Sequence, residues 1–298
     1  MNVLVTGGCG FIGSHLVDEL IKQNYDVTVI DNLSTGSIDF LNTQAKFYQK
    51  DIRDLESIRE HFKDKSIVYH LAAVPRIQPS FELPIYHEEV NVIGTINCLL
   101  ASNEYGIEKF IFSSSSSIYG NPNKIPTPEE SKINCLNPYA LQKFTAEQYC
   151  FILGKKFNLP IISLRYFNPY GPRSFNLMNP YNSYNSVVGI FNHQSKTTKK
   201  LTITGSGKQR RDFIHVYDLV SATILSSKKG INDEIINIGM GRSISINELA
   251  SYFECKIEYI PERLNEATVT EASITKANKI LKWKPKIEIK NAIDKELL

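Results

Sequence analysis

Short apolar runs alternate with longer amphipathic stretches through the first half of the chain. Five runs have the composition of strands buried on both faces, and they span residues 3–6, 27–31, 67–71, 110–113 and 161–165. The stretches between them carry apolar residues three and four positions apart, as amphipathic helices do, and they span residues 11–23, 55–62, 86–105 and 139–156. Strands and helices in alternation predict an α/β fold with a doubly wound parallel sheet.

After residue 165 the pattern changes. Residues 169–196 are rich in Pro, Gly, Asn and Tyr, and the pieces that follow are short: strand-like at residues 201–203, 235–238 and 256–259, helical at residues 216–227 and 246–253. We therefore expect a Rossmann domain over residues 1–168, to which residues of about 212–240 return. A smaller α/β substrate-binding lobe is expected mainly over residues 169–298.

The composition fits a globular enzyme and argues against several other classes. The 298 residues are 42% hydrophobic, and 34 Lys and Arg against 31 Asp and Glu leave a formal charge of +3, too balanced to indicate a nucleic-acid or membrane partner. No apolar run has the length of a membrane span. The cysteines are widely spaced without a C-x-x-C pair, which predicts neither a disulfide framework nor a metal site and favours a cytoplasmic location; they are Cys9, Cys98, Cys135, Cys150 and Cys255.

A glycine-rich turn follows the first strand and opens the first helix. Its spacing is Gly7-x-x-Gly10-x-x-Gly13, with Phe11 and Ile12 between the last two glycines. Glycines permit the tight turn and let a pyrophosphate approach the backbone at the positive helix N-terminus. The triplet alone is also compatible with a tight turn and nothing more.

The end of the second strand adds to the case for a dinucleotide. A carboxylate at Asp31 can accept hydrogen bonds from both hydroxyls of an adenosine ribose and would repel a 2′-phosphate. No Arg follows that could bind a 2′-phosphate, so NAD is predicted rather than NADP. The predicted cofactor residues in the loop after Asp31 are Asn32, Ser34, Thr35 and Gly36.

Two further segments belong to the predicted cofactor side. Asp51 would approach the adenine amine while Ile52 covers the ring, although a helix cap at Asp51 is an equal alternative. The fourth strand ends at His70, which we interpret as a packed structural residue, and the site continues into the small residues Leu71, Ala72 and Ala73.

Tyr139 and Lys143 place a phenol and an ammonium one helical turn apart. The spacing has little value by itself, because Tyr105/Lys109 and Tyr252/Lys256 share it. What distinguishes Tyr139 is the hydroxyl-rich strand end upstream, Ser113 to Gly120, since strand ends line the ligand crevice of an open α/β sheet. Lys143 and a nicotinamide cation would favour the phenolate, and Ser115 would hold the reacting hydroxyl.

In these residues the chain resembles the extended short-chain dehydrogenase/reductase family, specifically UDP-glucose 4-epimerases and their UDP-N-acetylglucosamine relatives. The matching motifs cover nearly the whole chain and span residues 7–13, 31–33, 51–52, 113–120, 139–143, 165–173, 211–213 and 281–285. The resemblance implies an isomerase in which Tyr139 removes the proton of the sugar 4-hydroxyl while bound NAD takes the hydride from C4. The 4-keto sugar then turns over and the hydride returns to its other face.

The resemblance also assigns residues by position. It places Asn91, Ser113 and Phe167 beside the cofactor and Ser117 beside the sugar. It implies that the UDP diphosphate is bound by Asn168, Arg211 and Arg263. Guanidinium groups suit phosphate oxygens. Glu266 stands where the family has an Asp on the uridine ribose, within an altered segment, Arg263-Leu264-Asn265-Glu266.

The remaining question is which sugar is converted. Ser116 and Ser117 replace the acidic residues that related dehydratases and decarboxylases use, which favours epimerisation. Thr270 aligns with a residue that gates the space beside the sugar 2-substituent; a small side chain there favours N-acetyl sugars, unless Thr270 is a strand residue pointing away. Arg76 would meet a carboxylate or an acetamide, or lie exposed in a loop.

Three alternatives stay open: a UDP-glucuronate 4-epimerase, a dehydrogenase that releases NADH, and an NAD-binding scaffold without activity. The helices at residues 86–105 and 139–156 carry apolar residues beyond one sheet-facing stripe, namely Leu99, Leu100, Phe144 and Tyr149. Because family members pair these helices, we expect a homodimer.

Overall fold

Seven parallel strands form the central sheet of the computed structural model, which describes residues 1–176, 185–263 and 265–295. Their order is β3-β2-β1-β4-β5-β6-β11, with bounds β1 Asn2–Thr6, β2 Asp26–Asp31, β3 Lys46–Gln49, β4 Ile67–His70, β5 Lys109–Ser115, β6 Ile161–Tyr166 and β11 Glu234–Ile238. The predicted doubly wound parallel sheet is confirmed. Its direction of winding reverses between β1 and β4, the place where such sheets bind ligands.

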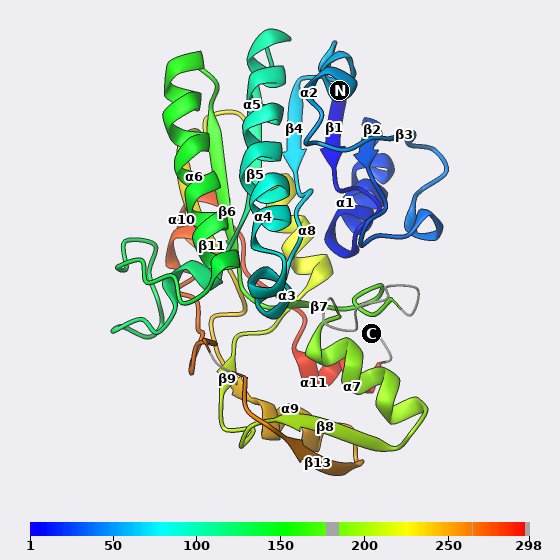
Figure 1. The fold of residues 1–298 in the computed structure, drawn as a ribbon, viewed down its shortest axis with the longest axis vertical. Coiled ribbons are helices and arrows are strands. Elements are labelled where there is room, and N and C mark those ends of the chain that lie inside the picture. Colours follow the sequence, from blue (N-terminus) through cyan, green and yellow to red (C-terminus); the bar gives the residue numbers. More distant parts are fainter. Residues whose placement is uncertain (177–184, 264, 296–298) are drawn as a thin grey trace.

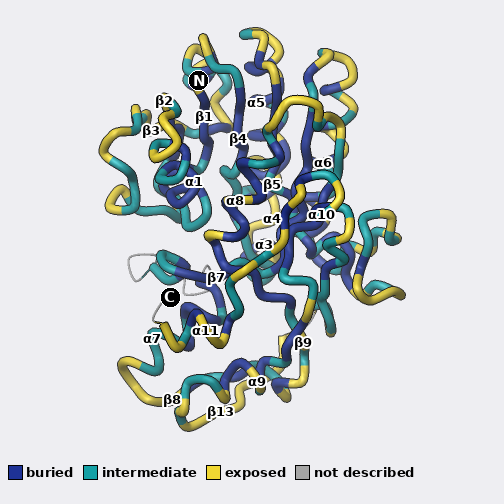
Figure 2. The backbone as a smooth tube through the Cα atoms, turned by 180° about the vertical axis from the view of Figure 1, so that it is seen from behind, coloured by how far each residue is buried: buried dark blue, intermediate teal, exposed yellow. Residues whose placement is uncertain are grey.

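Helices cover both faces of the sheet (Figure 1). One layer contains α1 (Phe11–Lys22), α8 (Val216–Ser226) and α10 (Thr275–Leu281), and the other contains α2 (Leu55–Ile58), α5 (Gly94–Glu104) and α6 (Pro138–Phe157). Alternate residues of a strand serve opposite layers: Val3 and Val5 pack with the first, and Leu4 with the second. Apart from the edge strand β3, which is mostly exposed, the strands form the buried centre of Figure 2.

The stretch predicted as one helix over residues 86–105 begins earlier and is interrupted. It consists of α4 (Pro84–Glu88), a π-helical segment (Glu89–Ile93) and α5, and it begins at a proline, which suits the first turn of a helix. Because a π-turn holds an extra residue, the faces beyond it are rotated. Leu99 belongs to the core, contrary to the surface role predicted for it, whereas Leu100 is exposed.

Of the other two residues assigned to that surface, Tyr149 is exposed, but Phe144 packs against a small cluster around Ile118 and Phe167. Large side chains that are exposed on α4, the π-helical segment, α5 and α6 are Ile85, Ile93, Leu100, Leu141, Tyr149 and Ile152. A groove between α4 and α6 runs through this apolar face.

A second, smaller body lies beyond the carboxyl ends of the strands, in the lower part of Figure 1. It has its own hydrophobic core, with Phe191, Leu201 and Leu249 among the buried residues. Its elements are α7 (Val187–Lys196), β8 (Lys200–Thr204), β9 (Arg210–Arg211), β12 (Ile244–Ser245), α9 (Ile246–Ser251), β13 (Lys256–Ile260) and α11 (Ile289–Asp294). The pairs are β8 with β13, parallel, and β9 with β12, antiparallel.

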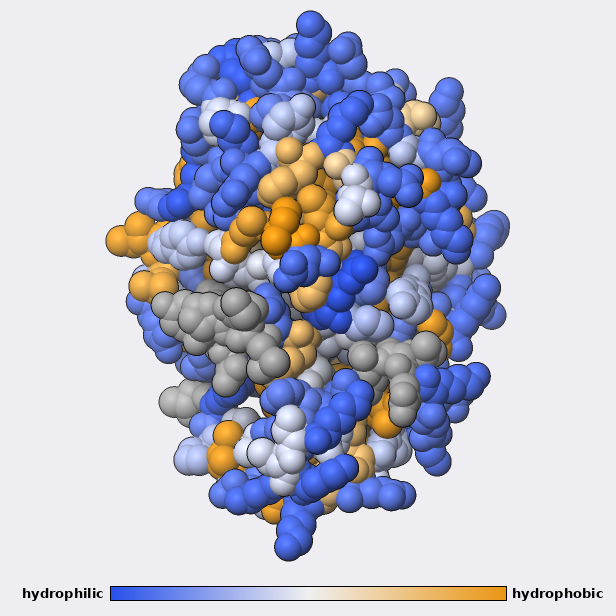
Figure 3. Space-filling view, turned by 90° about the vertical axis from the view of Figure 1, so that its right-hand side faces the viewer, coloured by the Kyte–Doolittle hydropathy of each residue, from blue (hydrophilic) through white to orange (hydrophobic). Residues whose placement is uncertain are grey.

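The chain crosses between the two bodies several times. A short parallel pair, β7 (Pro169–Tyr170) with β10 (Ile214–His215), lies at the crossing, and α8 and β11 then return to the large sheet. The sequence pattern did not predict α7, α10, α11 or the helix α3 (Ile77–Glu82), which are short and lie in mixed polar stretches. The side of the molecule shown in Figure 3 is largely hydrophilic, with hydrophobic side chains gathered in its upper half.

The five cysteines are free thiols, and three of them are buried. None of the helices in the described ranges has both the length and the apolar character needed to cross a membrane.

Candidate active site

A cavity of about 500 Å³ extends from the glycine turn after β1 to the smaller body. Many of the predicted site residues line it, although they come from distant parts of the chain: Gly7, Gly10, Phe11, Ile12, Gly13, Thr35, Leu71, Ala73, Ser113, Ser115, Ser117, Tyr139, Lys143, Asn168, Arg211, Arg263, Glu266 and Thr270. The smaller body adds apolar and polar wall residues that the sequence did not single out, among them Phe191, Thr204, Gln209 and Phe213.

The three glycines of the turn differ in what a side chain would meet. A Cβ at Gly7 (φ 75°) would lie 2.6 Å from the Ala72 amide nitrogen, and one at Gly13 would collide with the Gly7 carbonyl oxygen. At Gly10 only the Gly7 oxygen comes within 4 Å, at 3.3 Å, so that position opens toward the cavity. Gly7 and Gly13 therefore serve the fold, while Gly10 leaves room for a ligand at the α1 N-terminus. This arrangement fits the pyrophosphate of a dinucleotide.

Asp31 stands at the end of β2 with its carboxylate turned back to the glycine turn. Its two oxygens accept hydrogen bonds from the backbone N–H groups of Cys9 (2.9 Å) and Leu33 (2.8 Å). Burial raises the pKa of the carboxyl group, and the two hydrogen bonds oppose the rise. Each carboxylate oxygen keeps a second lone pair, which could accept a hydrogen bond from a ribose hydroxyl.

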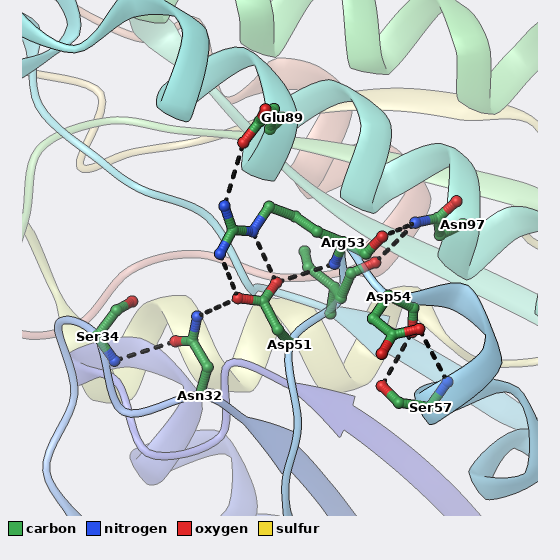
Figure 4. Close-up of polar contacts among 9 residues, drawn as sticks. Asn32, Ser34, Asp51, Arg53, Asp54, Ser57, Glu89 and Asn97 are labelled. Atoms are coloured by element: carbon green, nitrogen blue, oxygen red, sulfur yellow. Dashed lines mark hydrogen bonds and ion pairs between the residues drawn. The ribbon is translucent and has the colours of Figure 1, made fainter.

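Asp51 lies opposite Asn32 (Figure 4). Its carboxylate accepts from the Arg53 guanidinium (2.9 and 3.1 Å) and from the Asn32 amide (3.0 Å). Burial acts to raise the pKa of Asp51, but these hydrogen bonds lower it overall. The helix-cap alternative is wrong, because Asp54 is the residue that caps α2, accepting from the Ser57 N–H at 3.2 Å.

Several predicted cofactor residues are not among those that line the cavity. The Ser34 N–H donates to Asn32, a Cβ at Gly36 would collide with the Cys9 carbonyl group, and the Ala72 N–H donates to Thr6. The side chains of Ile52, Asn91 and Phe167 are buried in the protein. Their contact with a cofactor stays a prediction. His70 is the packed residue we predicted, held between Thr6 and Thr95, and burial lowers its pKa to about 3.

Helix α6 presents Tyr139 and Lys143 to the cavity from its first two turns. Asn137 caps the helix by accepting from the Ala140 N–H at 2.9 Å, and Pro138 occupies its first position. The pair Asn-Pro directly before the tyrosine is a helix-start signal that could have identified this position from the sequence. The other two Tyr/Lys pairs do not lie within a helix, because Tyr105 and Tyr252 end α5 and α9 whereas Lys109 and Lys256 begin strands.

Ser115 ends β5 and begins the 3₁₀ turn Ser116–Tyr119. Its hydroxyl accepts from the Ser117 N–H (3.2 Å) and from the Ser117 hydroxyl (2.9 Å), and it also hydrogen-bonds Tyr139. Two neighbouring hydroxyl groups thus face the same space as the phenol, which is what holding a reacting sugar hydroxyl requires.

Burial shifts the pKa of both Tyr139 and Lys143. Burial raises the pKa of Tyr139, opposed by the hydrogen bond with Ser115 and then by the positive charge of Arg76. Lys143 lies with its ammonium 4.7 Å from the centre of the Phe112 ring, and burial lowers its pKa to about 8. The positive charge of Arg76 thus opposes the effect of burial on Tyr139, and the influence predicted for Lys143 and a nicotinamide cation stays a prediction.

Arg211 and Arg263, the two arginines assigned to a diphosphate, line the cavity, and Glu266 lies near both of them. Glu266 pairs with Arg211 at 3.3 Å and lies 3.9 Å from Arg263. Arg211 is largely buried, which lowers the pKa of its guanidinium, while Arg263 is half-exposed. The neighbouring Leu264, part of the altered segment, lies outside the described residues.

Thr270 faces the cavity, so the alternative that it points away is wrong. Its hydroxyl accepts from the side-chain amide of Asn168 at 3.0 Å, and the same amide donates to the Asp212 carbonyl oxygen at 3.1 Å. Asn168 is thereby fixed by Thr270, a connection that no sequence spacing revealed.

Comparison with known proteins agrees with this geometry. The model of the NAD dependent epimerase/dehydratase family matches residues 3–239. A UDP-glucose 4-epimerase of Lactobacillus helveticus is 34% identical over 97% of this chain and 93% of its own.

Two solved structures are similar throughout. The UDP-glucose 4-epimerase of Thermotoga maritima with UDP-glucose is 37% identical, with a TM-score of 0.93 over 98% of this chain and 96% of that one. The UDP-N-acetylglucosamine 4-epimerase of Methanobrevibacter ruminantium, in complex with UDP-N-acetylmuramic acid, is 32% identical, with a TM-score of 0.90 over 98% and 97%.

Proposed function

Because the chain belongs to the NAD dependent epimerase/dehydratase family, we propose that it is an isomerase that inverts C4 of a UDP-hexose through a 4-keto intermediate. The observation that carries the proposal is the continuity of the cavity. One space joins the open face of Gly10, the Ser115–Tyr139–Lys143 group and the Arg211–Glu266–Arg263 group. A dinucleotide and a nucleotide sugar bound at the two ends would meet at the phenol.

Each group has a role that its chemistry permits. Tyr139 takes the proton of the sugar 4-hydroxyl and later returns it, and Ser115 and Ser117 orient that hydroxyl. Bound NAD supplies a hydride acceptor that gives the same hydride back. Lys143, one turn along α6, donates to the nicotinamide ribose, and Asp31 accepts from the adenosine ribose, which favours NAD over NADP.

The nucleotide is held at the other end of the cavity. Arg211 and Arg263 grip the diphosphate, since guanidinium groups form charge-assisted hydrogen bonds to phosphate oxygens. Asn168, held by Thr270, donates from the same side. Glu266 then exchanges its arginine partners for the uridine ribose.

We extend the proposal to UDP-N-acetylglucosamine. Thr270 is a small residue on the cavity wall and leaves space that an acetamide would occupy. The similarity to an enzyme named for that sugar supports the extension. A product analysis tests both: purified protein is incubated with UDP-glucose, UDP-N-acetylglucosamine and UDP-glucuronate without added NAD. We expect 4-epimers of the first two, and the absence of any epimer would refute the function.

The exposed apolar face on α4, α5 and α6 supports a homodimer in which these helices pair with those of a second copy. Leu141, which is 55% exposed, lies in the groove of this face. Leu141→Glu would place a charge there and should convert the dimer to a monomer in light scattering. A monomeric unmodified protein at micromolar concentration would contradict the assembly.

Two broader assignments stay proposals. The nucleotide-binding domain comprises residues 1–168 and the returning segment, to which we add α10 because it packs in the same core as α8. The five free thiols are compatible with the reducing cytoplasm.

A further inference from the structure

Two carboxylates are assigned to the adenosine half of the cofactor, and they differ in how many hydrogen bonds they accept from the protein. An ionised carboxylate has about four acceptor positions, two on each oxygen. Asp31 accepts from the backbone N–H groups of Cys9 and Leu33, one on each oxygen. A ribose hydroxyl can therefore donate to Asp31 without displacing a donor of the protein.

Asp51, in contrast, has donors of the protein at all of these positions. Its Oδ1 accepts from the backbone N–H (2.9 Å) and the Nε–H (3.1 Å) of Arg53. Its Oδ2 accepts from Nη2 of Arg53 (2.9 Å) and from the side-chain amide of Asn32 (3.0 Å). An adenine amine, predicted to donate to this carboxylate, can consequently bind there only if one of these donors gives way.

Arg53 is held by more than Asp51 (Figure 4). Its Nη1 donates to Glu89 at 3.1 Å, and its backbone carbonyl oxygen accepts from the Asn97 amide at 2.9 Å. Its guanidinium also lies 5.1 Å from the centre of the Tyr86 ring. Because its side-chain bonds to Asp51 join two opposite charges, they are stronger than a bond from a neutral amide. Arg53 is therefore the partner that Asp51 keeps.

Asn32 provides a single neutral donor from the loop after β2. The orientation of its amide is determined by its two neighbours, because the nitrogen faces the Asp51 carboxylate and the oxygen accepts from the Ser34 N–H at 3.0 Å. Of the donors on Asp51, the Asn32 amide is thus the one that costs least to displace.

We propose that Asn32 competes with the adenine amine for Asp51 and thereby sets how strongly the protein distinguishes adenine from other purines. The inference rests on the cofactor part of the proposed function, the contact of Asp51 with adenine. Since one hydrogen bond to Asp51 is lost for each one made, the amine adds little net affinity. A purine with an oxygen at position 6 leaves the bond between Asn32 and Asp51 in place and can accept from the second N–H of the same amide.

The test is a competition between two dinucleotides. Purified NAD-loaded protein is equilibrated with an excess of NAD and nicotinamide hypoxanthine dinucleotide in equal amounts, and the bound dinucleotides are quantified by mass spectrometry. The bound ratio gives the preference for the amine. The bases also differ at N1, but this difference is common to all variants and cancels when their ratios are compared.

Two asparagines of the same domain give a matched pair of variants. Asn32→Ser removes the amide nitrogen and keeps a side-chain oxygen that can accept from the Ser34 N–H. Asn42→Ser is the control, because the Asn42 amide donates to Asp18 at 2.9 Å and its oxygen accepts from the Gln44 N–H at 3.0 Å, the same two kinds of contact.

Asn32→Ser should raise the bound ratio of NAD to the hypoxanthine dinucleotide by about three- to tenfold, because the amine then donates to Asp51 without displacing a donor. Asn42→Ser should leave the ratio unchanged. In an Asp51→Ala background the effect of Asn32→Ser should disappear, as a double-mutant cycle measures. Asn32→Ala should raise the ratio in the same way and replaces the serine variant if that one does not fold.

A ratio that neither Asn32 variant changes would overturn the proposal and leave Asn32 only the role of holding its loop. A lower ratio would also overturn it, because Asn32 would then contact adenine directly. A rise that persists in the Asp51→Ala background would exclude Asp51 as the shared acceptor and overturn it too. No sugar takes part in the competition, so a failure to epimerise any UDP-sugar would refute the proposed isomerase and leave this result standing.

Discussion

The two ends of the cavity are built in different ways. The cofactor end is made of consecutive residues, Gly7 to Gly13, whose shape is dictated by backbone contacts too close for a side chain. The nucleotide end gathers Asn168, Arg211, Glu266 and Thr270 from separate segments, and their side chains satisfy one another in the protein alone. The first end is therefore rigid before it binds, whereas the second must exchange side-chain partners when a diphosphate arrives.

Tyr139 stands where the two ends meet, and its removal should have the largest effect. Tyr139→Phe keeps the ring but removes the group that takes the 4-hydroxyl proton, so kcat should fall by about a hundredfold or more. NAD should still bind, measured by calorimetry. Tyr105→Phe and Tyr252→Phe are the controls and should keep normal turnover; a Tyr139→Phe enzyme that does the same would refute the proton transfer.

At the cofactor end, two substitutions should separate the glycine that the fold requires from the glycine that leaves room for the cofactor. Gly13→Ala places a Cβ against the Gly7 carbonyl oxygen, so thermal unfolding should show a loss of about 1–3 kcal/mol. Gly10→Ala brings its Cβ to 3.3 Å from the Gly7 carbonyl oxygen, so its stability loss should be smaller than that of Gly13→Ala, while its NAD affinity falls by about tenfold or more. Equal stability losses in both variants, with NAD affinity retained in Gly10→Ala, would show that the turn has no special relation to the cofactor.

At the nucleotide end, a substitution should change the affinity for UDP and leave the affinity for NAD unchanged. Arg211→Ala removes charge-assisted hydrogen bonds worth about 1.5–3 kcal/mol, so the Kd for UDP should rise by about ten- to a hundredfold while NAD binding is unchanged. Arg242→Ala, an exposed arginine in the same body, serves as the control. If the two variants bind UDP alike, Arg211 does not contact the diphosphate.

The smallest effect is expected on the choice of sugar. Thr270→Tyr fills the space beside the proposed 2-substituent and should lower kcat/KM for UDP-N-acetylglucosamine by about tenfold relative to UDP-glucose. Thr270→Ser keeps the hydroxyl that holds Asn168 and should preserve the ratio. An equal loss on both substrates in Thr270→Tyr would mean that the substitution acts through Asn168 rather than by excluding the acetamide.

The cofactor end could be predicted from the sequence to a larger extent than the nucleotide end. The turn at Gly7–Gly13 and the alternation of strand and helix express local backbone rules, so pattern alone predicted the doubly wound sheet and the glycine turn after its first strand. Leu99 was misplaced because it and Leu100 are adjacent apolar residues, and the hydrophobic spacing did not show which of the two packs into the core. Asp51 was left between two roles because Asp54, three residues later, has the same capping chemistry.

The nucleotide end depends on contacts between residues 44 to 102 positions apart. Thr270 faces the cavity because its N–H pairs with the Arg210 carbonyl oxygen and its hydroxyl with Asn168. The loop after β4 is held by Asn91, which hydrogen-bonds the Val74 backbone, and the helix α3 that follows is held by Ser80, which accepts from the Tyr139 N–H. Such tertiary hydrogen bonds leave no periodic signal, which is why the resemblance assigned residues there but not their partners.

The fate of the C4 hydrogen tests the central claim most directly. UDP-glucose carrying deuterium at C4 is converted in ordinary water without added NAD, and the UDP-galactose formed is examined by NMR and mass spectrometry. One cavity that keeps both cofactor and sugar predicts that deuterium stays at C4 of the product and that no free NADH accumulates. Replacement of the deuterium by solvent hydrogen, or its appearance in released NADH, would contradict the account.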